Sequence, residues 1–327
     1  MRFALRRLGF FALTLWAALT LNFFLPRLMP GNPALAMMAK FRGPVNPQAY
    51  KALAVAFGLN NQQSLPSQYV TYLGDVATGK FGTSLYFYPQ SVGRVVLDAI
   101  PWTLGLVGIT TVLAFILGTG IGILAAWRRG GRLDSIAPPV FVIMSAIPYF
   151  WIGMMLILVF AVQLKWLPPA FGFDITLTPS LTLPFIGNVL EHALLPAIAL
   201  LVTTIGTWIL TMRNTMVTTL AEDYVRMARA KGLPGRRIML DYAARNAILP
   251  NLTGFAMSLG FVVGGAILVE YVFNYPGVGY MLLNAVTYED YPLMQALFLL
   301  ITVTVLLAIL LADIATAIFD PRTRTAG

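Results

Sequence analysis

Long uncharged, apolar runs separated by shorter polar segments make up most of the 327-residue chain. A helix needs about 20 apolar residues to cross a bilayer, and six runs approach or exceed that length. We expect spans at about residues 8–29, 101–127, 137–162, 191–212, 251–273 and 292–319. Pro148 interrupts the third run, so we expect a break there. The pattern predicts an all-α integral membrane protein, with one transmembrane domain of six helices over residues 1–327.

The first apolar run, from Leu8 to Leu25, follows three arginines at positions 2, 6 and 7. A secretory signal peptide has a shorter apolar core and a small-residue cleavage site. No such site precedes Pro30, so the sequence predicts a retained first helix. Residues 30–98 are rich in proline, glycine, asparagine and glutamine, and they predict an extracytoplasmic segment, partly helical, along the membrane surface.

The polar segment 213–250 interrupts the apolar pattern in the second half of the chain. Within it, Thr219 and Glu222 have the spacing of a capping box, in which each side chain bonds a free amide at a helix start. Gly232 suits a left-handed helix end, and a proline two residues later prevents continuation. We therefore expect a short helix over residues 219–233.

Helical spacing places Ala221, Tyr224, Val225 and Ala228 on one side of that helix. Small residues around a tyrosine make a face that fits a groove on a partner protein. The alternative is a solvated basic loop that only reflects membrane topology, and the spacing by itself favours neither reading.

Composition places the chain among membrane proteins, because 58% of its residues are hydrophobic and only 11% are charged. Soluble domains carry about 25% charged residues. The chain has no cysteine, which excludes disulfides, thiolate metal sites and a cysteine nucleophile in it. Its single histidine argues against a histidine-rich metal site.

The positions of the basic residues predict the orientation in the membrane, because cytoplasmic loops carry an excess of lysine and arginine. Of the 22 basic residues, fifteen fall in the two ends and in the loops after the second and fourth spans. They are Arg2, Arg6, Arg7, Arg128, Arg129, Arg132, Arg213, Arg226, Arg229, Lys231, Arg236, Arg237, Arg245, Arg322 and Arg324. We expect both termini in the cytoplasm and, despite a net charge of +9, no nucleic-acid partner.

Residues Gly74 to Lys80 imitate a phosphate-binding loop. That motif needs serine or threonine after the lysine and a buried strand before the first glycine. Phe81 follows the lysine here, and the segment lies in the predicted extracytoplasmic region. We therefore expect no nucleotide site there.

Two glycine pairs, Gly118 with Gly122 and Gly260 with Gly264, have the spacing that lets helices approach closely, so we expect packing seams there.

Charged residues inside spans are costly and prompt functional hypotheses. Glu270 lies near the outer end of the fifth span, where its carboxylate either faces a pathway and meets a peptide amine or has a structural role. Glu191 and His192 begin the fourth span, and we expect them at the membrane interface.

Several motifs, in order along nearly the whole chain, resemble those of one family. The most specific runs from Asp223 to Leu233 and resembles DYVRTARAKGL, and Arg245 to Pro250 resembles the RNALLP that follows it. Weaker matches keep the same order: residues 28–33 resemble LLPGDP, 79–84 GDLGTS, 148–153 PSFWLG, 270–279 ETVFSYPGLG and 313–322 DLLYALLDPRIR. The chain resembles a permease subunit of the dipeptide/oligopeptide/nickel class of bacterial ABC importers, the first of the two paired permeases.

The resemblance implies a type I ABC importer permease in the bacterial cytoplasmic (inner) membrane, a multi-pass protein in contact with the lipid bilayer. It implies a second homologous permease, one or two cytoplasmic ATPase subunits that bind Mg-ATP, and an extracytoplasmic solute-binding protein as partners. This chain would then hold no catalytic residue, metal or cofactor.

The resemblance also assigns contact residues. Those expected at the ATPase are Glu222, Asp223, Tyr224, Val225, Arg226, Ala228, Arg229, Ala230, Lys231 and Gly232. Those expected at the solute-binding protein are Tyr275, Pro276 and Gly277. Two positions depart from the family pattern, because Gly105 replaces a usual glutamate and Tyr242 a common histidine.

The cargo stays open, because a permease sequence specifies its solute poorly. Short peptides are expected, with oligosaccharides or nickel as alternatives within the same importer class. An ion-coupled, stand-alone carrier is a rival class, which predicts inverted repeats or broken helices around buried charges. An intramembrane protease would need paired catalytic side chains in facing spans, and no GxSxG motif occurs in the chain.

Overall fold

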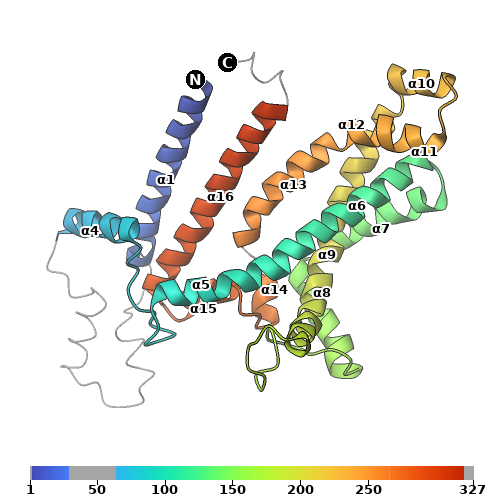
Figure 1. Ribbon diagram of the computed structural model, residues 1–327. Coiled ribbons are helices and arrows are strands. Elements are labelled where there is room, and N and C mark those ends of the chain that lie inside the picture. Colours follow the sequence, from blue (N-terminus) through green and yellow to red (C-terminus); the bar gives the residue numbers. More distant parts are fainter. Residues whose placement is uncertain (1, 29–63, 265, 320–327) are drawn as a thin grey trace.

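The computed structural model describes residues 2–28, 64–264 and 266–319, and these residues are predominantly helical (Figure 1). They contain no β-strand beyond an isolated bridge between Thr83 and Ser91. The helices are α1 (Arg2–Leu28), α4 (Leu65–Thr78), α5 (Val92–Thr103), η1 (Leu104–Gly108), α6 (Ile109–Trp127), α7 (Arg132–Ala146), α8 (Tyr149–Leu156), η2 (Ile157–Gln163), α9 (Leu183–Thr219), α10 (Asp223–Ala230), α11 (Gly235–Arg237), η3 (Ile238–Ala244), α12 (Arg245–Ala247), α13 (Leu249–Phe261), η4 (Val262–Gly264), α14 (Ile267–Val272), α15 (Val278–Thr287) and α16 (Tyr291–Phe319).

Three helical stretches among the described residues are long and apolar enough to cross a membrane by themselves. They are Val92–Trp127, Leu183–Thr219 and Tyr291–Leu310. Two more qualify only as bent pairs, Arg132–Ala146 with Tyr149–Gln163 and Gly235–Ala247 with Leu249–Gly264. This arrangement agrees with an all-helical integral membrane protein, while the number of six spans stays a prediction.

The predicted break at Pro148 is present. Helix α7 ends at Ala146, and the helical stretch that begins at Tyr149 is bent from it by 95°. Ile147 has extended backbone angles, as a residue before proline favours. Pro148 is the N-cap of α8, a position where its missing N–H removes no helical hydrogen bond.

Two helical stretches are longer than the spans predicted within them. The second helical stretch begins at Val92 and passes Pro101 without a break. Its first turns are stabilised by packing, since Val92 and Ala99 are fully buried in a cluster with residues of α15 and α16. Helix α9 likewise extends beyond the predicted 191–212 at both ends.

The segment between the predicted fifth and sixth spans contains the ten-residue helix α15. Leu282 and Ala285 of this helix pack against Leu293 and Met294 of α16. The fifth span itself is divided into α13, η4 and α14, and Ala266 before α14 has non-helical backbone angles.

The glycine seams are confirmed as sites of close helix packing. A Cβ atom at Gly118 would lie 2.6 Å from the Cβ of Trp208, and one at Gly122 would lie 2.7 Å from the carbonyl oxygen of Ile209, both on α9. A Cβ at Gly260 would overlap Ala308 of α16. Helix packing this close requires residues without a side chain.

Helix α4 lies across the end of α1 and is fastened to it by hydrogen bonds (Figure 1). The hydroxyl groups of Thr20 and Tyr69 are 2.7 Å apart, and the side-chain amide of Asn22 donates to the Tyr72 hydroxyl at 3.2 Å. The region that imitates a phosphate-binding loop is the C-terminal half of this helix and its glycine cap. Most of the predicted segment 30–98 before α4 lies outside the described residues.

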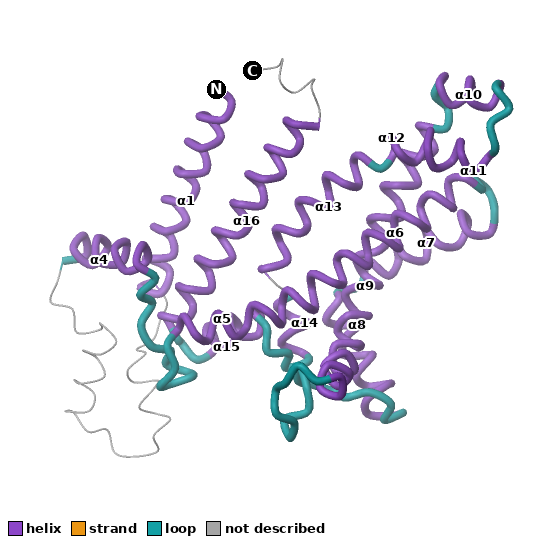
Figure 2. Tube along the Cα trace, viewed as in Figure 1, coloured by secondary structure: helices purple, strands orange, loops and turns teal. Residues whose placement is uncertain are grey.

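The helices of the polar segment and the longer loops lie at opposite ends of the helical assembly. Helices α10 and α11 lie at the same end as the start of α1 and the end of α16 (Figure 1). The longer loops of the described chain, residues 79–91 and 164–182, lie at the opposite end (Figure 2).

Candidate functional site

The start of α10 differs from the predicted capping box. Helix α9 continues through Thr219, whose hydroxyl donates to the carbonyl oxygen of Thr215 at 2.8 Å. Glu222 is itself the N-cap residue, and its side chain makes no capping hydrogen bond. The capping-box prediction is wrong because Thr219 belongs to the preceding helix.

The end of α10 is as predicted, because Gly232 adopts a left-handed conformation with φ +72°. The amide of Gly232 donates to the carbonyl of Arg229 at 2.9 Å, and the amide of Leu233 donates to that of Ala228 at 3.3 Å. This pair of bonds is the Schellman motif, which satisfies free carbonyls at a helix end.

Two of the four residues on the predicted partner-facing side of α10 pack inside the protein. Val225 is fully buried and Ala228 is 2% exposed, both in a cluster with Ile238 of η3. Trp127 at the end of α6 and Leu220 at the end of α9 pack against the same cluster. Val225 and Ala228 therefore hold α10 on the transmembrane helices and are covered within this chain.

The exposed face of α10 carries most of the other expected contact residues. Tyr224 is 40% exposed, and Met227, which the sequence reading passed over, is 58% exposed. The signal for Met227 was its position one turn after Tyr224, on a helix with Val225 and Ala228 buried. The exposed expected residues are Glu222, Asp223, Tyr224, Arg226, Arg229, Ala230, Lys231 and Gly232.

The two halves of the polar segment are joined by side chains. The Asn246 amide donates to the Tyr224 hydroxyl at 3.0 Å and to the Tyr242 carbonyl at 3.1 Å. The hydroxyl of Thr215 in α9 donates to the Ala247 carbonyl at 2.9 Å. Helices α10 and α12 are thereby fixed to each other and to α9.

An ion pair fixes the base of this region. Arg213 of α9 binds Asp134 of α7 through two nitrogens, and its Nη2 is 3.0 Å from Asp134 Oδ2. Its Nε donates a hydrogen bond to Asp134 Oδ1. The Asp134 side chain is only 6% exposed and also accepts from the Gly130 amide at 2.9 Å. The sequence reading missed this pair because its members are 79 positions apart.

Glu270 lies in a closed network at the other end of the molecule. It is fully buried, and its carboxylate accepts from the Thr103 hydroxyl at 2.8 Å and from the amides of Gly279 at 2.7 Å and Tyr280 at 3.2 Å. This enclosure within the chain supports the structural alternative for Glu270.

The turn that follows Glu270 is largely buried as well. Tyr275 is 2% exposed and Gly277 is buried, while Pro276 is partly exposed. A Cβ at Gly277 would lie 2.5 Å from the Glu270 carboxyl carbon and from the Thr103 hydroxyl. Tyr275 and Gly277 close the network around Glu270, and the expected contact of this turn with a solute-binding protein stays a prediction.

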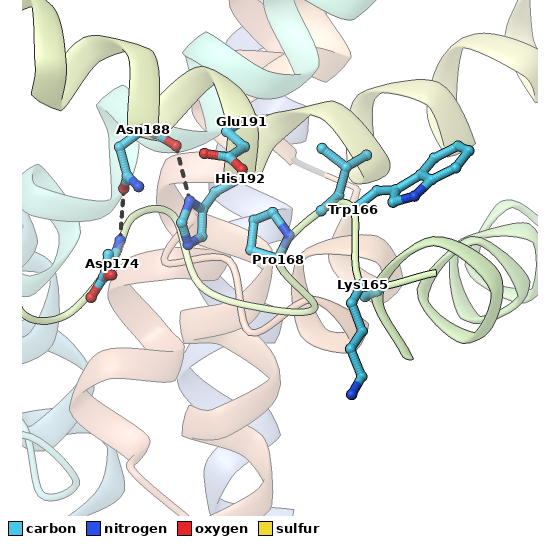
Figure 3. A pocket seen from close by; sticks show the side chains of 9 residues that line it. Lys165, Trp166, Pro168, Asp174, Asn188, Glu191 and His192 are labelled. Carbon is cyan, nitrogen blue, oxygen red and sulfur yellow. Dashed lines mark hydrogen bonds between the residues drawn. The ribbon is translucent and has the colours of Figure 1, made fainter. Parts of the chain in front are cut away.

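A pocket of about 410 Å³ opens between the 164–182 loop and the start of α9 (Figure 3). Its lining includes Lys165, Asp174, Asn188, Glu191 and His192, and the Lys165 side chain points away from the other four. Hydrogen bonds from the backbone and hydroxyl of Thr176 hold the pKa of Asp174 below its usual value. The sequence drew attention to the Glu191–His192 pair but not to the loop that completes the pocket.

No group of three histidine, aspartate or glutamate side chains in the part of the chain that the structure describes is arranged to hold a metal ion.

Comparison with known families matches residues 118–325 to the family described as the binding-protein-dependent transport system inner membrane component. The chain belongs to this family. The matched range contains the 213–250 segment, Glu270 and α15.

Relatives of this permease cover almost its whole length. It is 34% identical to the di/tripeptide transport system permease protein DppB of Pseudomonas aeruginosa (strain UCBPP-PA14), over 98% of each chain. It is 33% identical to the oligopeptide transport system permease protein AppB of Bacillus subtilis (strain 168), over 92% of each. With the dipeptide transport system permease protein DppB of Escherichia coli (strain K12) it shares 32% identity over 99% of each.

Proposed function

We propose that this permease is one of two paired membrane subunits of an ATP-driven importer of short peptides. The peptide permeases named above support the cargo, because they align with this chain over at least 92% of both lengths. The family description supports a solute-binding protein as a partner. In this proposal separate subunits bind and hydrolyse Mg-ATP, and this chain supplies half of the pathway.

The packing of α10 on the long helices is the main observation that supports its coupling to an ATPase. Its buried side packs on the ends of α6 and α9 through Trp127 and Leu220, while Tyr224 and Met227 face outward. A force on the outer face would therefore reach two long apolar helices through packed side chains. A short helix that ends in a left-handed glycine can move as a rigid unit.

Electrostatics favour an acidic partner surface for this region. The exposed basic residues of the segment are Arg226, Arg229, Lys231, Arg236, Arg237 and Arg245. Exposed acids neutralise them only weakly, because the Arg226–Asp223 and Arg237–Asp241 contacts are 3.6 and 3.8 Å long and open to solvent.

The proposal includes six spans with both termini in the cytoplasm of a bacterial inner membrane. Support comes from the basic residues, which concentrate at the end that holds α10, and from the start of α1 and the end of α16 lying at that same end (Figure 1).

The first test is ATP hydrolysis by the assembled complex in lipid, with short peptides or short oligosaccharides delivered by its own binding protein. Stimulation by peptides is expected. Stimulation by sugars alone would retain the importer and replace the cargo. Uptake driven by an ion gradient without ATP would favour a stand-alone carrier.

A matched pair of methionine variants tests the coupling face. Met227→Ser should lower peptide-stimulated hydrolysis several-fold, because it removes an exposed apolar contact from α10. Met155→Ser in α8 is the control, since Met155 is 42% exposed and lies outside this segment. Equal activity of both variants, or failure of any ATPase subunit to assemble with the chain, would sink the coupling role.

A further inference from the structure

Four tyrosines gather on the described surface at the end of the molecule opposite α10. The rings of Tyr86 and Tyr288 stack with centroids 4.4 Å apart and planes inclined by 18°. Tyr280 lies close enough to influence the Tyr86 phenol, and burial together with Tyr288 and Tyr280 raises the pKa of Tyr86. Tyr271 extends the row, with its ring centroid 6.4 Å from that of Tyr280. We call these residues the tyrosine row.

Two buried carboxylates accept hydrogen bonds from main-chain amides of this row. Asp290 is fully buried and accepts from the Ser84 hydroxyl and from the Tyr86 amide at 2.9 Å. Glu270 accepts from the Tyr280 amide at 3.2 Å. Burying a carboxylate is costly unless it is hydrogen-bonded, so each network fixes its tyrosine firmly. The rings are therefore positioned before any ligand arrives.

An acidic residue beside the row occupies a strained position. Glu289 has φ +54° at the end of α15, where the amide of Asp290 donates to the Ala285 carbonyl at 2.8 Å. Glycine or asparagine normally takes this left-handed place. The Glu289 side chain is partly exposed and forms no ion pair with the described residues. A residue kept in an unfavourable conformation is a reason to look for a role of its side chain.

We propose that the tyrosine row and Glu289 form a contact site for the free ammonium group and adjoining side chain of a peptide in transit. Tyrosine faces attract cations and pack against planar or apolar groups. The Glu289 carboxylate supplies the opposite charge. This inference rests on the proposed peptide cargo, and it adds a solute contact on the permease itself.

The test measures uptake by the reconstituted complex at saturating concentrations of its binding protein, with phenylalanine-containing tripeptides that have a free amino terminus. Glu289→Gly should lower uptake several-fold. It should leave the midpoint of thermal unfolding unchanged or higher, because glycine suits the left-handed backbone. Glu289→Asp should retain part of the uptake, since it keeps the charge.

Ring variants provide the matched controls. Tyr288→Leu should lower uptake, whereas Tyr288→Phe, which keeps the ring, should retain most of it. Tyr88→Leu should have no effect, because Tyr88 is 58% exposed in the same loop and is outside the row.

Four outcomes would overturn the inference. Uptake by the Glu289 and Tyr288 variants equal to that of the unmodified complex would remove it and leave the proposed cargo intact. Losses that appear only at sub-saturating binding protein and are absent at saturation would show a docking surface for that protein. Equal losses for Tyr88→Leu and Tyr288→Leu would show membrane anchoring by aromatic residues. An unmodified complex that takes up no peptide would sink the cargo proposal and this inference together.

Discussion

The side-chain amide of Asn246 donates a hydrogen bond to the phenolic oxygen of Tyr224 across 3.0 Å. The two residues belong to separate polar motifs, 22 positions apart, and their bond ties α12 to the exposed side of α10. A displacement of α10 is thereby transmitted to the segment that leads into α13.

Removing this bond should weaken coupling without unfolding the protein. Tyr224→Phe removes this one exposed hydrogen bond, a change of about 1 kcal/mol, and Asn246→Ala removes it together with the bond to the Tyr242 carbonyl. Each should lower peptide-stimulated ATP hydrolysis, and the double variant should lose no more than the larger single loss, because both changes break the same bond. Fully additive losses in that double-mutant cycle would contradict the direct link.

Gly232→Ala should destabilise the end of α10 through backbone strain only. No atom lies within 4 Å of a Cβ built there, but φ +72° costs a residue with a side chain about 1 kcal/mol. Peptide-stimulated hydrolysis should fall while complex assembly persists. Gly120→Ala is the control, since Gly120 is helical with equally open surroundings, and it should leave activity unchanged.

The Glu270 network should be among the most sensitive sites in the chain. Glu270→Ala leaves two amides and a hydroxyl without their acceptor, at about 1–3 kcal/mol for each orphaned group. Gly277→Ala should be equally harmful, because its Cβ would lie 2.5 Å from Glu270 and Thr103 atoms. Glu270→Gln should be milder, since its amide oxygen keeps one acceptor. Thermal unfolding in detergent measures all three, and an unchanged midpoint for Glu270→Ala would refute the structural role.

The Asp134–Arg213 pair should resist conservative replacement. Arg213→Lys loses the two-nitrogen geometry, and we expect a loss of about 1–2 kcal/mol, because the aspartate is nearly buried while the arginine is partly solvated. Asp134→Asn should cost a similar amount. The charge-swapped double variant should recover part of the stability measured by thermal unfolding, and no recovery would argue against a direct pairwise interaction.

Single cysteines test the proposed topology, because the chain has none of its own. Cysteine at Lys231 should react with a membrane-impermeant maleimide only from the cytoplasmic side. Cysteine at Thr176 should react only from the opposite side. Labelling of both from the same side would overturn the single span predicted between these positions and the membrane orientation built on it.

Sequence alone was enough wherever a property depends on local composition. The apolar runs predicted transmembrane helices, the proline at 148 predicted a break, and Gly232 predicted a left-handed helix end. Glycine spacing also predicted the seam at Gly118 and Gly122. Each of these follows from the bilayer or from backbone geometry, which act on a residue regardless of its distant neighbours.

Tertiary packing decided the direction in which side chains face. Val225 and Ala228 fit a partner-facing pattern equally well, and only the ends of α6 and α9 beneath them show that this side is buried. Helix α15 lies between two predicted spans, in a segment where the sequence predicted no helix, and its apolar residues are stabilised against α16.

The chain by itself determined the membrane class, most helical segments and the family, because hydrophobicity, helix-ending residues and ordered motifs can be read locally. Only the tertiary structure decided that Glu270 is enclosed and that Tyr224 is bound to Asn246. The physical reason is that burial and hydrogen bonding depend on groups far apart in the sequence. Thr103 and Glu270 are 167 positions apart, and only the folded chain brings them to 2.8 Å.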